Sequence, residues 1–199
     1  MSLTPVPAGQ IATIVTSLEM LAPPKPRPIP PSPLQVTRWP SPAPGKYRAL
    51  FRRVGEPWLW FSRLVMSDAE LGAIIGDPAI EIYAVTDTSG IEVGMLELDF
   101  RGRDAVEISF FGLVPELTGK GHGRWLMARA LMLAWRKGIG RVWVHTCTID
   151  HSSALAFYRA QGFTPFAVAI ETFADPRLAG IYKREAAPHV PLLDPASRR

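Results

Sequence analysis

The chain has 199 residues, of which 47% are hydrophobic and 20% are charged, ordinary values for a soluble globular protein. This length can close a hydrophobic core as one domain with at most an appendage. No stretch approaches the roughly 20 apolar residues of a membrane-spanning helix, so we expect no membrane association. The apolar run 11–21 lacks the basic start of a secretory signal, and the single cysteine, Cys147, fits a reducing cytoplasm.

The net charge of +4 is concentrated at the start of the chain. Residues 1–54 carry seven basic residues against one acidic residue, a balance of +6, which leaves −2 for residues 55–199. A basic leading segment on a slightly acidic body is typical of a solvated tail and not of a face that follows a nucleic-acid groove. We therefore expect no nucleic-acid binding.

A proline-rich stretch divides the chain near its start. Seven of the eleven residues 23–33 are proline, which excludes a helix and favours an extended, semi-rigid strap. The β-rich residues 11–21 before it could be a strand of the main sheet or an arm added to its edge, and the pattern leaves both open. We assign residues 1–44 to this strand and strap, 45–185 to the main domain and 186–199 to a peripheral C-terminal tail.

The main domain is predicted to begin with two short helices and a three-stranded meander. The helices span 47–54 and 68–75, and Ser67 with Glu70 has the spacing of a capping box at the start of the second. Strands at hairpin spacing follow at 80–86, 92–100 and 105–113. Turn-forming residues separate these strands, so we predict that they pair antiparallel.

The second half of the main domain alternates helices with strands. In chain order we predict a helix at 121–137, a strand at 141–148, a helix at 152–161 and a strand at 163–173. The long helix is apolar nearly all round, which indicates burial on more than one side. A meander followed by this alternation predicts an α+β fold with a central mixed, twisted sheet flanked by helices on both faces.

Three glycines lie within five residues where the third meander strand leads into the long helix: Gly119, Gly121 and Gly123. Glycine lets the backbone approach a ligand closely, and the free N–H groups of a helix N-terminus favour a phosphate. The spacing matches neither a mononucleotide P-loop nor the dinucleotide fingerprint. We therefore expect a pyrophosphate-binding loop of another class.

This loop resembles the acyl-coenzyme A motif of the GNAT superfamily of N-acetyltransferases. The family signature is Arg or Gln, two residues, Gly, one residue, then Gly or Ala. Here it reads Thr118, Gly121, Gly123, following an aliphatic strand end and Pro115. Thr118 departs from the signature because it stands where Arg or Gln is usual, although backbone N–H groups could still bind a pyrophosphate.

A second segment is similar to another signature of the same family. In that signature a helix carries a tyrosine four residues before Gly-Phe, which here is Tyr158 before Gly162 and Phe163. His151 stands where the family usually has asparagine. The two motifs together cover residues 106–165. The distance between them along the chain also matches the family, so the pair is more specific than either motif alone.

The resemblance implies a GNAT-like fold and an N-acetyltransferase. Acetyl-coenzyme A (acetyl-CoA) would be the co-substrate, and a primary amine of a small molecule or peptide would be the acceptor. The strand before the loop would bulge and splay, for which Gly112 is suited, so that backbone groups near residues 111–113 contact the pantetheine arm. The implied cofactor-binding residues are Phe111, Leu113, Thr118, Gly119, Lys120, Gly121, His122, Gly123 and His151.

Two side chains are candidate catalytic groups for proton transfer. Glu107, with Asp99 and Glu97 on the neighbouring strand, could accept a proton from the amine directly or through water, or could be a solvent-facing strand residue. Tyr158 matches the family's thiol-protonating tyrosine, because a phenol with a pKa near 10 remains a donor at neutral pH. The alternative for Tyr158 is a ring that only packs.

The remaining candidates are weaker. His145 and Cys147 share one face of a strand, but no second ligand pair accompanies them, so we expect no metal site. Several aromatic residues could line an acceptor pocket or belong to the core: Trp39, Trp58, Trp60, Phe61, Phe110 and Phe111. The competing function is a non-catalytic module that binds acyl-CoA and acts through a protein partner. A homodimer is a candidate assembly.

Overall fold

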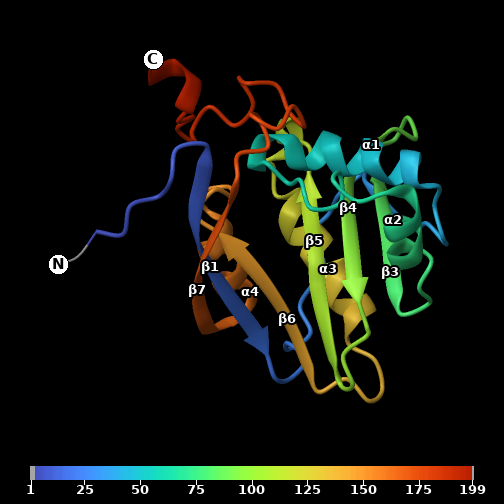
Figure 1. Ribbon diagram of the computed structural model, residues 1–199. Helices are drawn as coiled ribbons and strands as arrows, with labels where there is room; N and C mark the ends of the chain where they lie inside the picture. The colour runs from blue at the N-terminus through green and yellow to red at the C-terminus, as the bar shows by residue number, and fades with distance from the viewer. Residues whose placement is uncertain (1–2, 199) are drawn as a thin grey trace.

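The computed structural model describes residues 3–198, which form one seven-stranded sheet with helices on both faces (Figure 1). The strands are β1 Gln10–Met20, β2 Gln35–Arg38, β3 Ile80–Thr86, β4 Glu92–Asp99, β5 Ala105–Leu113, β6 Arg141–Cys147 and β7 Thr164–Ala174. Their order in the sheet is β2-β3-β4-β5-β6-β1-β7. All neighbours are antiparallel except β5 and β6, which run parallel. The predicted α+β fold with a mixed central sheet is confirmed.

Four α-helices cover the sheet, two on each face: α1 Pro44–Gly55, α2 Asp68–Ile75, α3 His122–Ala134 and α4 Ala154–Gln161 (Figure 1). Short 3₁₀ turns add η1 Glu56–Trp58, η2 Pro115–Leu117 and η3 Pro195–Arg198. The capping box of Ser67 and Glu70 is present at α2. The long helix ends before the predicted residue 137, because Trp135 has extended backbone and its ring packs into the core. No helix within residues 3–198 is long and apolar enough to cross a bilayer.

The first strand lies inside the sheet. β1 pairs with β6, where Val15 is opposite Cys147, and with β7, where Ile11 is opposite Phe173. Of the two alternatives for the N-terminal strand, the structure therefore selects a strand of the main sheet. Residues 10–20 and the segment 45–185 share this one sheet.

The proline-rich stretch has no helix or strand, as predicted, and leads into β2 at the edge of the sheet. β2 was not among the predicted strands, because a four-residue strand with one apolar side chain is too short to give a periodic signal. The Ser32 hydroxyl lies 3.0 Å from Nδ1 of His122, so the stretch contacts the start of α3.

The C-terminal tail is partly buried, which corrects the prediction that it is peripheral. Ala187 and Val190 belong to a third apolar cluster that includes Ile11 of β1. The physical reason is the buried Arg177, whose guanidinium pairs with Asp175 at 2.7 Å. The same guanidinium donates to tail carbonyls, among them that of Val190 at 2.9 Å. The sequence suggested only a turn at residues 175–177.

Candidate active site

The two parallel strands at the centre of the sheet separate halfway along their length. β5 and β6 pair at Ala105–Glu107 with Arg141–Trp143, and no described residue beyond Glu107 continues the ladder. Figure 1 shows the two strands diverging from this point. A cavity of about 760 Å³ occupies the opening. It is large enough for a ligand of considerable size, since ligand pockets commonly span about 300–1,000 Å³.

A β-bulge lies on β5 just after the strands part. Glu97 of β4 is opposite Phe110 and Leu98 is opposite Ile108, which leaves Ser109 as the extra residue. A bulge bends its strand and increases the local twist, so it turns β5 away from β6. The bulge expected near Gly112 therefore lies three residues earlier.

Gly112 serves a different purpose from the one expected. A Cβ atom at this position would lie 2.6 Å from Cγ1 of Val54 on α1 and 3.1 Å from the Trp60 ring. Glycine thus allows α1 and Trp60 to pack closely on β5. The ring of Trp60 in turn forms part of the cavity wall.

The separation leaves backbone groups of β5 free to face the cavity. The Val114 N–H donates to the Val93 carbonyl at 2.9 Å, which fixes the phase of the antiparallel ladder with β4. Bonded pairs alternate along such a ladder, so Gly112 bonds to β4, whereas Phe111 and Leu113 direct their N–H and C=O groups toward β6. Both of these residues line the cavity.

The glycine loop closes one end of the cavity. Gly119 and Gly121 have φ of 77° and 85°, a conformation that side-chain-bearing residues rarely adopt. Gly121 is the N-cap of α3, and no side chain caps this helix. Its first N–H groups and the positive end of its dipole therefore remain available for an anion.

The cavity lining contains most of the predicted cofactor-binding residues. These are Phe111, Leu113, Thr118, Gly119, Gly121, Gly123 and His151. Arg124, which the sequence did not single out, adds a positive charge beside the loop. Lys120 and His122 are not part of the lining. The ring of His122 instead contacts Ser32.

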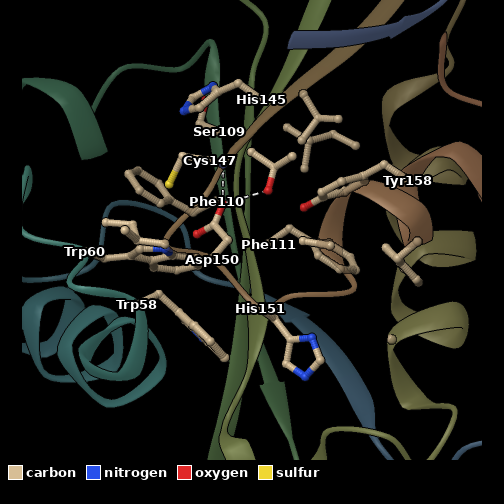
Figure 2. A pocket seen from close by; sticks show the side chains of 18 of the residues that line it. Trp58, Trp60, Ser109, Phe110, Phe111, His145, Cys147, Asp150, His151 and Tyr158 are labelled. Carbon is tan, nitrogen blue, oxygen red and sulfur yellow. Dashed lines mark hydrogen bonds between the residues drawn. The ribbon is translucent and has the colours of Figure 1, made fainter. Parts of the chain in front are cut away.

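Aromatic rings form much of the opposite wall. They come from η1 and the segment after it, and from β5 and β7: Trp58, Trp60, Phe61, Phe110 and Phe173. Trp60 and Phe110 have ring centroids 5.3 Å apart, and Trp58 lies edge-on to the His151 ring at 5.4 Å (Figure 2). Trp39 lies outside the cavity, where it packs against the core and under Lys46.

Glu107 and His145 meet where the strands part. Oε1 of Glu107 lies 3.2 Å from Nδ1 of His145, and both side chains line the cavity. The hydrogen bond to Glu107 raises the pKa of His145 above its ordinary value, although burial opposes this shift. With Nδ1 engaged by the carboxylate, Nε2 is the ring nitrogen left for a ligand.

The other two predicted carboxylates are differently placed. Glu97 is buried under α1, where it accepts hydrogen bonds of 2.6 Å from the Tyr47 hydroxyl and from Arg63, so its expected role in proton transfer is wrong. Asp99 does line the cavity, but Arg101 holds it. Burial acts to raise the pKa of Asp99, but the hydrogen bonds from Arg101 keep this pKa below its ordinary value.

Tyr158 projects from α4 into the middle of the pocket, on the opposite side from Trp60 (Figure 2). Its ring is buried against Phe111 and Phe157. Burial, and then the charge of Asp150, raise the pKa of Tyr158. The phenol therefore keeps its proton across the physiological pH range.

Asp150 lines the cavity but does not belong to either sequence motif. Its Oδ2 accepts hydrogen bonds from the Thr146 hydroxyl at 2.7 Å and from the Cys147 N–H at 2.8 Å, and so fixes the turn after β6. Its position in the turn three residues after β6 was the available signal, because Asp side chains commonly hydrogen-bond the backbone of turns. Burial, and then Asp150, raise the pKa of Cys147 to about 11, which makes this thiol a poor nucleophile. No group of three or more metal-ligand side chains is present within residues 3–198.

Comparison with known proteins supports the likeness seen in the motifs. Residues 47–163 match the model of the acetyltransferase (GNAT) family. No curated protein matches the chain. A GCN5-related N-acetyltransferase from Sphaerobacter thermophilus is 17% identical with a TM-score of 0.60, over 81% of this chain and 51% of that one.

Two further solved structures share the fold at low identity. A functionally unknown conserved protein from Staphylococcus epidermidis is 14% identical with a TM-score of 0.53, over 84% of this chain and 63% of that one. An aminoglycoside acetyltransferase from an uncultured soil metagenomic sample, in complex with sisomicin, is 16% identical with a TM-score of 0.53, over 65% and 88%. The chain thus spans less than two thirds of the Sphaerobacter and Staphylococcus proteins. Because the family model covers more than half of the chain, and the sheet, the parted strands and the glycine loop agree with it, the protein belongs to the GNAT family of acetyltransferases.

Proposed function

We propose that the protein transfers an acetyl group from acetyl-CoA to a primary amine. The observation that carries this proposal is the parting of β5 and β6 beside an uncapped helix N-terminus. Around the resulting cavity lie free backbone donors, a glycine loop and two candidates for proton transfer. Membership of the GNAT family supports acetyl transfer in general.

The residues present fit a coenzyme A pyrophosphate at the loop. Gly119 and Gly121 keep the loop free of Cβ atoms at positive φ, and nothing lies within 4 Å of a Cβ built at Gly119. The N–H groups at the start of α3, with Arg124, would hold the phosphates, which supports binding without the usual Arg or Gln at Thr118. The outward backbone groups of Phe111 and Leu113 would hold the pantetheine arm.

The chemistry requires a donor to the carbonyl oxygen and a base for the amine. Acetyl-CoA supplies a thioester whose carbonyl oxygen gains negative charge as the amine attacks. An N–H on the free side of β5 is already oriented by the β4 ladder, so it can stabilise this charge without reorganising. Phe111 and Leu113 provide such groups.

We assign proton uptake from the amine to the Glu107–His145 pair. An amine attacks only as the free base, so the site must remove a proton before or during the attack. His145 would accept it at Nε2, while Glu107 holds Nδ1 and stabilises the charged ring. Glu107, the residue proposed from sequence, would act through His145 and not through water.

Tyr158 is proposed to return a proton to the departing thiolate. Its raised pKa keeps it protonated, and its hydroxyl points into the cavity from the α4 side (Figure 2). No described residue forms a hydrogen bond with this hydroxyl. Within residues 3–198 the hydroxyl therefore has no competing partner.

The acceptor is proposed to be a small-molecule or peptide amine. Aromatic rings, which can contact a cation, form the wall opposite the loop. The carboxylates of Glu171 and Glu107 also line the cavity and have no arginine or lysine partner among the described residues, so they can attract a cationic amine. We further propose the cytoplasm as the compartment, in agreement with the free thiol of Cys147.

Thiol release from acetyl-CoA, measured with a panel of polyamines, amino acids, aminoglycosides and peptides, tests the proposal. Acetyl-CoA alone should also raise the unfolding free energy by about 2.7 kcal/mol at about 100 times its Kd, and NAD should not. Binding of acetyl-CoA without turnover of any amine would favour the acyl-CoA-binding module instead. Stabilisation by NAD but not by acetyl-CoA would contradict both.

A further inference from the structure

The outer edge of β7 is exposed over its whole length. β7 is the last strand of the sheet, paired with β1 on one side and with no strand of residues 3–198 on the other. Ten of its eleven residues are exposed, and only Phe173 is half-buried. Figure 1 shows no helix lying along this side of the strand.

The middle of this edge is aliphatic. Val168 is 69% exposed and Ile170 is 76% exposed, and Ile14 of β1, which is 49% exposed, lies opposite Ile170. Soluble proteins usually protect an edge with a charged side chain or a proline within the strand. β7 has both, in Pro165 and Glu171, but the five residues 166–170 between them contain neither. An exposed, uncharged apolar stretch of this kind favours pairing with another strand.

The free backbone groups belong to the same residues. The Asp175 N–H donates to the Gly9 carbonyl at 2.9 Å, which fixes the phase of the ladder between β7 and β1. Because bonded pairs alternate, the odd-numbered residues of β7 bond to β1, and Val168, Ile170 and Thr172 point their N–H and C=O groups outward. Exposed aliphatic side chains and unpaired backbone groups thus coincide.

We propose that β7 pairs antiparallel with β7 of a second copy of this chain, around a two-fold axis at Ala169. In this register Val168 lies opposite the partner's Ile170, and Ile170 opposite the partner's Val168. Both are outward-facing residues, so each pair exchanges two backbone hydrogen bonds. The four aliphatic side chains, with Ile14 from each copy, form one continuous apolar patch on the same face of the joined sheet.

The charges of the strand favour this occupant and this register. Glu171 is the only charged residue of β7, and it lies opposite the partner's Ala167. The two glutamates then stand four residues apart, about 13 Å along the strands. A two-fold axis at Ile170 would instead make the two glutamates diagonal neighbours, about 7–8 Å apart, and would place Val168 opposite the partner's Thr172.

Within residues 3–198 no other strand pairs with this edge of β7. The dimer would also stabilise one wall of the cavity, because Glu171 and Phe173 of β7 line this cavity. The pairing does not depend on which reaction the cavity performs.

Light scattering coupled to size exclusion tests the assembly with the full chain. The wild type should have about twice the 21.9 kDa mass of one chain, and the Val168→Lys, Ile170→Lys double variant should have the mass of one. Val65→Lys, at a valine that is 58% exposed outside the sheet, is the matched control and should stay dimeric. A wild type that remains monomeric at high micromolar concentration overturns the proposal and leaves the edge for a different partner.

Amide hydrogen exchange measured by NMR tests the register of backbone pairing. In the wild type the amides of Val168 and Ile170 should be protected, as should those of Ala169 and Glu171. In the double lysine variant the even-numbered amides should exchange rapidly while the odd-numbered ones remain protected by β1. Rapid exchange at Val168 and Ile170 in a wild-type dimer would overturn the proposal. This wild-type measurement decides the matter even where the lysine variant fails to fold.

Discussion

Glu107 lies opposite Trp143 in the last pair of the ladder between β5 and β6, and its Oε1 is 3.2 Å from Nδ1 of His145, two residues further along β6. A carboxylate that fixes one nitrogen of an imidazole leaves the other nitrogen as a proton acceptor. The pair also makes the stability of the fold depend on pH, because the pKa of His145 is raised in the folded state.

The first prediction concerns this titration. Glu107→Gln should lower the pKa of His145, since burial then acts without the opposing carboxylate; an NMR titration of the ring measures it. A raised pKa contributes stability in full below the unfolded value of 6.5, and this contribution is lost as pH rises through the folded pKa. Urea unfolding should therefore show a larger wild-type advantage over Glu107→Gln at about pH 6 than at about pH 9. In a His145→Gln background the advantage should not vary with pH, and an unchanged His145 pKa in Glu107→Gln would contradict the pairing.

The second prediction separates the base from its partner. Once an acceptor is found, His145→Gln should lower kcat/KM by roughly 10²-fold to 10⁴-fold, the usual range for a general base, with little change in acetyl-CoA affinity. Glu107→Gln should keep part of the activity and shift the acidic limb of the pH profile to lower pH. If Glu107→Gln loses more activity than His145→Gln, the carboxylate itself takes the proton.

The third prediction concerns the acid. Tyr158→Phe retains the ring and its packing, so stability and acetyl-CoA affinity should change little, whereas kcat should fall by roughly 10²-fold or more. The loss belongs in kcat because the proton is needed only as the carbon–sulfur bond breaks. Tyr83→Phe is the matched control, because the Tyr83 hydroxyl bonds to Glu81 away from the cavity. Equal kcat for Tyr158→Phe and wild type, with chemistry limiting the rate, would leave Tyr158 a packing residue.

The fourth prediction concerns the glycine loop. Gly121→Val should abolish acetyl-CoA binding in calorimetry, because a branched side chain at φ 85° distorts the loop and occupies the space beside the first N–H groups of α3. Gly90→Val carries a similar strain, at φ 79° in the turn between β3 and β4, and lies outside the cavity. Both variants should lose roughly 1–3 kcal/mol of stability. Only the loop variant should lose binding, and normal binding by a folded Gly121→Val would exclude this loop as the pyrophosphate site.

The sequence predicted those features that short segments determine. The capping box at Ser67, the meander and the glycine loop each depend on residues within a few positions of one another, and all three form as expected. The place of β1 could not be predicted, because Val15 finds Cys147 across more than a hundred residues of chain. The bulge at Ser109 depends on the register against β4, which no local pattern specifies.

The site followed the same division. The resemblance to the family motifs predicted that the glycines and Tyr158 lie at the site, and they line the cavity, since motif positions are local to one helix or loop. The pairing of Glu107 with His145 could not, because it depends on where two parallel strands cease to pair. Glu97 is two residues before Asp99 on β4, so both side chains lie on the same face of the strand. However, α1 covers Glu97, and the Tyr47 hydroxyl donates a hydrogen bond to it.

The last prediction concerns the N-terminal strand. β1 bonds on both sides, to β6 and to β7, and contributes the buried Leu18 and Met20 to the core. Removing residues 1–34 should therefore separate β7 from the sheet, expose the edge of β6 and cause aggregation or loss of cooperative unfolding. Removing residues 1–5 should have little effect, because residues 3–5 are exposed. Circular dichroism and size exclusion compare the two truncations. A shorter chain that starts at residue 35, stays soluble without aggregating and binds acetyl-CoA would show that β6 and β7 can close the sheet without β1.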